Sequence, residues 1–294
     1  MLFGGRSALE GMRLVCTKLL CVSTTLLVIS GCSHLSFIYS FAESALKEET
    51  AFFLHLDDDE ERLVYRKIDE FLAWHRAEML PRYAFFMNAQ ADLLAGDKID
   101  GTAVVRAVRI MRALLDDLVQ GAAPYVAEVL VNHTSQEKLS HLDVRMAERL
   151  EERREALNEP AEERLKVRAE RIITNFERLT GDLTDDQTDR IHRYAAQTAG
   201  ADLVWFRTRK NRQRALLDFL SREPDQNQIR AFAIKIVLRG YEIVDPEYKA
   251  ISEERWRSFT TLLADIIVSL SPEQRATMTK TLRIYAIEVL ALAE

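Results

Sequence analysis

The chain has 294 residues, a net charge of −6 at pH 7 and charged side chains at 29% of its positions. This mild acidity argues against a general nucleic-acid-binding protein, and the 10 glycines and 6 prolines are few enough for a body built mostly of helices. The length suffices for one large helical domain or for two lobes.

The first recognisable element is an apolar run of 11 residues, Leu19 to Ile29, which follows the positively charged Arg13 and Lys18. This order is typical of an export signal. The run is shorter than the roughly 20 residues that a membrane-spanning helix requires. The alternatives are an uncleaved signal anchor and a buried strand. Met12 is an alternative to Met1 as the first residue, because a signal peptide that begins at Met12 has a usual length.

The apolar run ends in Ile29-Ser30-Gly31-Cys32, which resembles the lipobox of bacterial lipoproteins. The resemblance implies cleavage before Cys32 and acyl chains on the thiol and amine of that residue. Several acyl chains together anchor a protein stably, at about 0.8 kcal/mol for each buried methylene group. Ser33 follows, where an aspartate would favour the inner membrane. The resemblance therefore implies a lipid anchor at Cys32 in the outer membrane, with the protein facing the periplasm.

The remaining cysteines, Cys16 and Cys21, would leave with the signal, so the mature chain would contain no disulfide and would depend on an apolar core. We divide the chain into a signal peptide at 1–31, a lipidated N-terminus with the first helix at 32–56, and a helical periplasmic body at 57–294.

The body shows the periodicity of amphipathic helices. In residues 60–80 and 104–119, apolar side chains recur at intervals of three, four and seven, and charged side chains fill the other positions. We expect Pro81 to end or kink the first of these helices, and Gly121 and Pro124 to interrupt the second. No sustained alternating pattern predicts a strand. The predicted fold is all-α, a multi-helix and mostly antiparallel bundle.

The middle of the chain, about 134–180, is dense in charges of both signs and leaves only a narrow apolar seam. We interpret it as two solvated helices joined near Pro160. They would form a charged helical hairpin or an arm that projects from the body. A surface hairpin that only connects its neighbours is the alternative.

Three stretches share one pattern: LDDDE from Leu56, LTDDQ from Leu183 and LSPEQ from Leu270. Each has a side chain that can cap a helix, followed three residues later by Glu or Gln, which is the pattern of a capping box. The last two also resemble the LTxxQ motif of small periplasmic stress chaperones. That resemblance implies an all-helical protein and keeps a chaperone or envelope-stress role open.

A broader resemblance covers the whole mature chain. It rests on FLAWHRAEMLPRYAFFM from Phe71, RAERIITNFERLTGDLTDDQ from Arg168 and WFRTRKNRQRALLDFL from Trp205. These segments are similar to a family of proteobacterial lipoproteins known only as a domain of unknown function. The resemblance implies a helical periplasmic fold and no established activity, so it assigns no catalytic residue.

A basic segment carries five positive charges within eight residues of a helical pattern: Arg207, Arg209, Lys210, Arg212 and Arg214. A solvated helix face is one interpretation. Docking to an anionic partner, either a phosphate-bearing lipid or an acidic envelope protein, is the other. The acidic stretch that begins at Leu56 could instead neutralise these charges within the chain.

Four apolar side chains near Pro81 are candidates for a surface that binds unfolded clients, because Met and aromatic residues adapt to varied partners. They are Met79, Phe85, Phe86 and Met87. At helical spacing the same residues also suit a buried core.

No pattern of catalytic or cofactor-binding residues stands out. His75 and Glu78 could share one helical face, but a metal needs further ligands, and the other histidines lack a metal-binding spacing. We therefore expect no enzyme, no metal and no cofactor. The first interpretation is a non-catalytic envelope interaction or structural protein. The alternatives are an LTxxQ-type chaperone and, third, a hydrolase of envelope polymers.

Overall fold

The computed structural model describes residues 34–96, 99–155 and 158–294. The signal, the lipobox and Cys32 lie outside these residues. The chain divides into two units, Met1–Ala42 and Glu43–Glu294, and helix α2 (His34–Phe53) crosses the boundary. Of the first unit the structure describes only the helical residues 34–42.

The second unit is built from helices, which confirms the all-α prediction. The helices in chain order are α2, α3 (Asp58–Trp74), η1 (His75–Met79), α4 (Leu80–Ala95), α5 (Gly101–Leu130), α6 (Gln136–Glu155), α7 (Ala161–Thr180), α8 (Asp185–Gln197), α9 (Ala201–Leu220), α10 (Gln226–Leu238), η2 (Gly240–Glu242), α11 (Tyr248–Val268) and α12 (Pro272–Ala291). Among the described helices, none combines the length and the apolar character that a membrane span needs.

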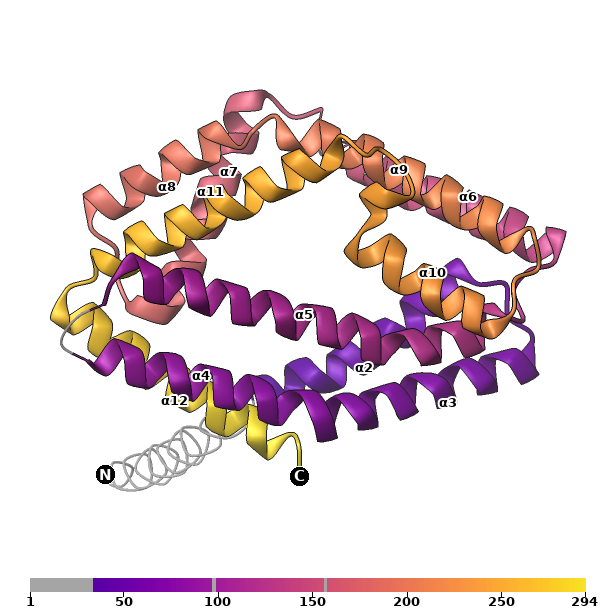
Figure 1. Ribbon diagram of the computed structural model, residues 1–294, viewed down its shortest axis with the longest axis horizontal. Helices are drawn as coiled ribbons and strands as arrows, with labels where there is room; N and C mark the ends of the chain where they lie inside the picture. Colours follow the sequence, from indigo (N-terminus) through magenta and orange to yellow (C-terminus); the bar gives the residue numbers. More distant parts are fainter. Residues whose placement is uncertain (1–33, 97–98, 156–157) are drawn as a thin grey trace, which may run out of the picture. The chain divides into compact units, whose positions relative to one another are not determined.

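Two clusters of buried apolar residues hold these helices together. The larger cluster draws on α4, α5, α7, α8, α11 and α12, and the smaller one on α3, α5, α6, α9 and α10. Helix α5 belongs to both, because Val104 lies in the larger cluster and Ala127 and Val129 lie in the smaller one. In Figure 1, α5 runs from one group of helices to the other. The middle of α5 therefore lies between two cores.

Pro81 changes the helix type without ending the helical path. Helix α3 passes into a single π-helical turn, η1, in which the backbone N–H of Leu80 donates to the carbonyl of His75. Helix α4 then begins with Pro81 in its first turn, where the missing N–H of proline is least costly. The wider turn accommodates a residue that a regular α-helix would exclude.

The prediction that Gly121 and Pro124 interrupt their helix is wrong, because α5 continues through both to Leu130. A Cβ atom at position 121 would lie 2.0 Å from ring carbons of Trp74, so glycine allows α5 to approach that ring closely. Helix α5 as a whole packs against α3, α10 and α11, and it continues although Pro124 has no backbone N–H to donate.

The charged segment 134–180 forms two helices, as expected, but each packs mainly on other parts of the unit. Helix α6 lies along α9, and α7 packs on α8 and α12 (Figure 1). Helix α7 buries Ala169 and Phe176 in the larger cluster, whereas α6 adds Leu139 and Leu142 to the smaller one. The narrow apolar seam is thus divided between two cores.

All three predicted capping boxes are present, at Asp57, Thr184 and Ser271. A fourth, Asp225 with Gln228, begins α10 and was not predicted, although its spacing is the same.

The two glutamines of the LTxxQ-like stretches also bind each other. Nε2 of Gln187 donates to Oε1 of Gln274 at 3.1 Å, and Nε2 of Gln274 donates to Oε1 of Gln187 at 3.0 Å. Both side chains are buried, at 2% and 8% exposed. Gln187 also donates to the carbonyl of Ser269, and Gln274 to that of Asp182. This amide pair ties the beginning of α8 to the beginning of α12.

Candidate ligand-binding cavity

A long cavity of about 790 Å³ lies beside the smaller cluster. Its walls come from α2, α3, α5, α6, α9 and α10, and most of the lining side chains are aliphatic or aromatic. The volume falls within the range of about 300–1,000 Å³ that is typical of small-molecule sites. We call this space the long cavity.

The walls of the long cavity include apolar side chains that are not covered by protein. Leu46 is 38% exposed, Val126 41% and Val237 57%, and all three line the cavity. Leaving apolar surface uncovered costs about 25 cal/mol for each Å². The cavity therefore presents apolar surface that a ligand would cover favourably.

Two of the charged side chains in the long cavity are neutralised within the protein. Lys67 forms ion pairs with Glu70 and Glu128, and Glu49 forms one with Arg149. The remaining charged lining residues are Arg209 and Arg212 of α9. Neither forms an ion pair within the part of the chain that the structure describes.

Arg209 and Arg212 are three positions apart, so they share one face of α9. Nη1 of Arg212 donates to the carbonyl of Ile236 at 3.3 Å, and its guanidinium lies over the ring of Tyr248. Arg209 lies over Trp205. In both arginines the Nε atom is buried and lacks a hydrogen-bond partner among the described residues. Burial, reinforced by the nearby charge of Arg153, lowers the pKa of Arg209 from its ordinary value.

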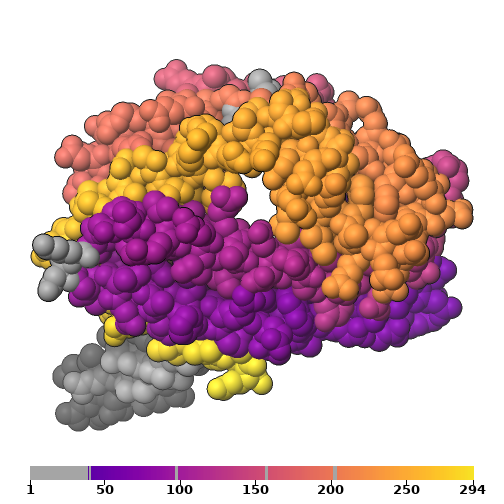
Figure 2. Space-filling view, in the orientation of Figure 1, coloured from indigo at the N-terminus to yellow at the C-terminus, as the bar shows by residue number. Residues whose placement is uncertain are grey.

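Beyond these arginines lies a second space of about 360 Å³, which we call the polar chamber. Its walls come from α5, α9, α10, η2 and α11, and they include the aromatic rings of Trp205, Tyr248 and Trp256. Figure 2 shows an opening among α5, α10 and α11 through which the background is visible. Arg209, Arg212 and Val237 line both spaces, so the long cavity and the polar chamber adjoin at these three residues.

The basic segment predicted as a docking surface is thus divided by the fold. Arg207, Lys210 and Arg214 are exposed on α9, whereas Arg209 and Arg212 are half-buried and line the cavity. Arg207 lies 3.5 Å from Glu247. The acidic residues after Leu56 do not neutralise the segment among the described residues, since Glu60 pairs with Lys138 and Asp59 with Arg62.

The four residues of the predicted client surface do not lie on one face. Met79 is fully buried at 0% exposure, and Phe85 is 78% exposed. Phe86 and Met87 are half-buried. The alternative of a core position therefore fits Met79 and does not fit Phe85.

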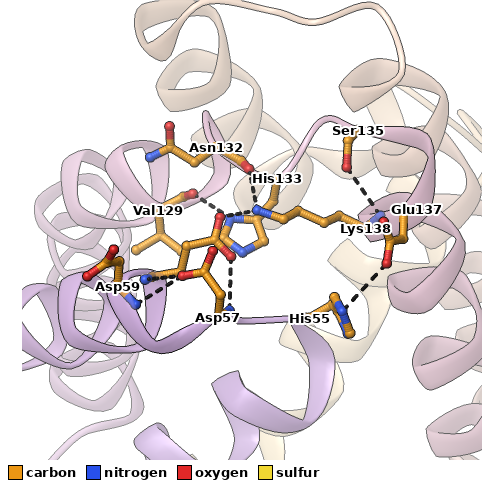
Figure 3. A network of polar contacts seen from close by, with 10 residues as sticks. His55, Asp57, Asp59, Val129, Asn132, His133, Ser135, Glu137 and Lys138 are labelled. Atoms are coloured by element: carbon orange, nitrogen blue, oxygen red, sulfur yellow. Dashed lines mark hydrogen bonds and ion pairs between the residues drawn. The ribbon is translucent and has the colours of Figure 1, made fainter.

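A polar network joins the turn before α3 to the turn before α6 (Figure 3). Lys138 forms an ion pair with Glu60 and donates to the carbonyl of Asn132 at 3.1 Å. His133 is 3% exposed, and its Nδ1 lies 2.8 Å from the carbonyl oxygen of Val129. Burial lowers the pKa of His133 from its ordinary value. The network fastens two turns together, and of the residues named here only Val129 also lines the long cavity.

His75 and Glu78, which could share one helical face, lie in different surroundings. His75 lies among aromatic rings, 6.1 Å from that of Phe71 and 5.6 Å from that of Tyr83, and Glu78 is exposed. Burial lowers the pKa of His75 from its ordinary value. Across the described residues, no three His, Cys, Asp or Glu side chains are grouped as metal ligands.

The basic segment is visible in the sequence, but the cavity is not. The expected apolar stripe of α5 includes Leu115, which is 46% exposed and lines the polar chamber. An apolar side chain on a cavity wall has the same spacing as one in a core, so periodicity does not separate them.

The described residues form an all-helical fold with a mostly apolar cavity that is basic where it adjoins the polar chamber. The chain belongs to the family of unknown function DUF6279, whose model matches residues 52–238. The match confirms the predicted uncharacterised family, while the proteobacterial lipoprotein character remains a prediction. No curated protein and no solved structure matches the chain.

Proposed function

We propose that this protein is a non-catalytic lipoprotein of the periplasm, anchored in the outer membrane through Cys32, and that it binds an apolar ligand in the long cavity. The observation that carries the binding role is the cavity itself, with its volume of about 790 Å³ and its apolar walls. The lipobox pattern at Ile29–Cys32 supports the anchor and the location.

The chaperone alternative has less support. Gln187 and Gln274 of the LTxxQ-like stretches have a structural task in the buried amide pair. Met79, one of the four residues chosen for a client surface, belongs to the core. A hydrolase has no specific observation in its favour.

Ligand binding can be tested with N-phenyl-1-naphthylamine, a neutral dye that fluoresces in apolar surroundings. We expect the full chain carrying Cys32→Ser, purified without detergent, to bind this dye. Val126→Trp should weaken binding at least tenfold, because the indole would occupy the long cavity from a position on α5 that is 41% exposed. Fluorescence titration measures the dissociation constant.

The matched control is Val105→Trp, a substitution on the same helix at a position that is 44% exposed and lies outside the lining of both spaces. It should leave dye binding unchanged. Absence of dye binding, or equal weakening by both tryptophans, would contradict the proposed site.

The anchor predicts a change of location. Cys32→Ser should abolish acylation and release the protein from the outer-membrane fraction, because a serine cannot form the thioether that carries diacylglycerol. Membrane fractionation and the intact mass of the purified protein measure both effects. Persistence of the Cys32→Ser protein in the outer membrane, together with a wild-type mass without acyl chains, would refute the lipobox interpretation.

A further inference from the structure

The junction between the long cavity and the polar chamber joins two different chemical environments. On one side the walls are aliphatic and aromatic, and on the other they carry hydroxyl, guanidinium and carboxylate groups. A ligand that fills both spaces must have an apolar part and a polar part, with the change between them beside Arg209 and Arg212. An amphiphile has this construction.

The charge around the polar chamber is positive on balance, because three arginines and two carboxylates line it. Asp116 and Glu253 also line the polar chamber, together with a third arginine, Arg112. Arg112 lies over the ring of Trp256, and neither carboxylate forms an ion pair with any of the three arginines among the described residues. A partly buried charge without a partner is costly, so an entering anion would be stabilised here.

The side chains around the junction leave hydrogen-bonding capacity unused. Within the described part of the chain, each of the two guanidinium groups has a buried Nε–H without a partner, and one Nη group of Arg212 already donates to the Ile236 carbonyl. Thr208, on the same helix, is 2% exposed, lines the polar chamber, and has a hydroxyl without a partner among the described residues. The remaining Nη groups of the two arginines suit an oxyanion, since the planar arginine fork binds phosphate and carboxylate oxygens in pairs.

Space for the guanidinium of Arg212 depends on Gly240. A Cβ atom at position 240 would lie 2.4 Å from Nε of Arg212, so any other residue would displace this group. The backbone of η2 therefore accommodates the arginine at the junction. The site is shaped around the charged group and not only around the apolar lining.

We infer that the ligand is a single-chain anionic lipid with a phosphate-ester head group, whose acyl chain fills the long cavity and whose phosphate binds between Arg209 and Arg212. This inference rests on the proposed function of the long cavity. A phosphate ester fits better than a carboxylate, because the polar chamber offers about 360 Å³ beyond the arginines for the rest of the head group.

The experiment displaces N-phenyl-1-naphthylamine from the full chain carrying Cys32→Ser, with each lipid kept below its micelle concentration. The competitors are lysophosphatidylglycerol, a neutral monoacylglycerol and a fatty acid, all of the same chain length. We expect lysophosphatidylglycerol to bind roughly tenfold or more tightly than the monoacylglycerol, because hydrogen bonds to charged groups contribute that much. It should also bind more tightly than the fatty acid.

The double variant Arg209→Gln with Arg212→Gln should lose the preference for the phosphate lipid over the monoacylglycerol, with both lipids measured by displacement of the dye from the same variant. The matched control is Arg207→Gln with Arg214→Gln, which removes the same charge from the exposed side of the same helix. It should keep the preference. Gly240→Ala should weaken the preference by displacing Arg212.

Three results would overturn the inference. The first is equal affinity for the phosphate lipid and the monoacylglycerol, and the second is equal affinity for lysophosphatidylglycerol and the fatty acid. The third is a preference for the phosphate lipid that survives in the double variant of Arg209 and Arg212. In each of these cases the dye still binds, so the cavity retains its proposed function. If the dye does not bind, the proposed function fails first, and this inference fails with it.

Discussion

Replacing Gln187 by alanine is expected to lower the free energy of unfolding by about 2–4 kcal/mol, because the change leaves buried polar atoms without partners. The substitution removes the bond to the Thr184 amide that completes a capping box. It also deprives the buried amide of Gln274 of both bonds to its partner. Gln274→Ala should have an effect of similar size. Urea unfolding followed by circular dichroism measures both.

Gln228→Ala is the matched control, because Gln228 holds the same position in the capping box of α10 but is exposed. We expect this substitution to cost about 1 kcal/mol or less. The double variant of Gln187 and Gln274 should lose less than the sum of the two single losses, since each single change already breaks the pair. If Gln187→Ala and Gln228→Ala lower the free energy of unfolding equally, the amide pair contributes nothing to stability.

Replacing Lys138 by methionine is expected to lower the free energy of unfolding by about 2–3 kcal/mol at pH 7. Removal of one partner of an ion pair leaves a poorly solvated charge on the other. The side chains of Lys138 and Glu60 are only 19% and 18% exposed. Arg257→Met is the matched control, because Arg257 pairs with Glu254 at the surface, where the two side chains are 72% and 61% exposed. That change should have almost no effect. A similar loss from both substitutions would argue against a special role for the polar network.

The polar network also predicts how the stability lost in Lys138→Met depends on pH. Burial opposes ionisation of Glu60, but the hydrogen bonds from Lys138 and from the Asp57 amide outweigh it and lower the pKa of Glu60. A carboxyl group with a lowered pKa stabilises the folded protein above its ordinary value of 4.5, and that contribution is lost as the pH falls further. The gap between wild type and Lys138→Met should therefore narrow below about pH 4.5. A gap of constant size down to pH 3.5 would contradict this assignment.

His133 adds a loss of stability at a higher pH. Burial lowers its pKa, and the nearby charge of Lys138 lowers it further, although the hydrogen bond to the Val129 carbonyl and the charges of Glu60 and Asp57 oppose them. The unfolded chain then takes up a proton more readily than the folded one as the pH drops through 6.5, so acid favours unfolding. In urea unfolding between pH 8 and pH 5.5, wild type should lose more stability than Lys138→Met, because the pKa of His133 in that variant lies closer to its ordinary value.

The sequence by itself determined the helical class and the places where several helices begin. Apolar spacing of three and four residues specifies a helix face, and a capping residue with Glu or Gln three positions later specifies a start. Asp57, Thr184 and Ser271 all cap helices as expected. Asp225 obeys the same rule and could have been found from it. These features depend on neighbours within one helical turn, and such neighbours are visible in the sequence.

Only the tertiary structure decided what each helix face meets. Gly121 and Pro124 lie inside α5 because Trp74 and the surrounding helices pack there. Arg209 and Arg212 separate from Arg207 because α9 has one side on the cavity and the other in solvent. A cavity wall and a dry core require the same apolar residues at the same spacing. They differ only in whether helices distant in sequence close the space between them, and long-range packing, not local pattern, controls that closure.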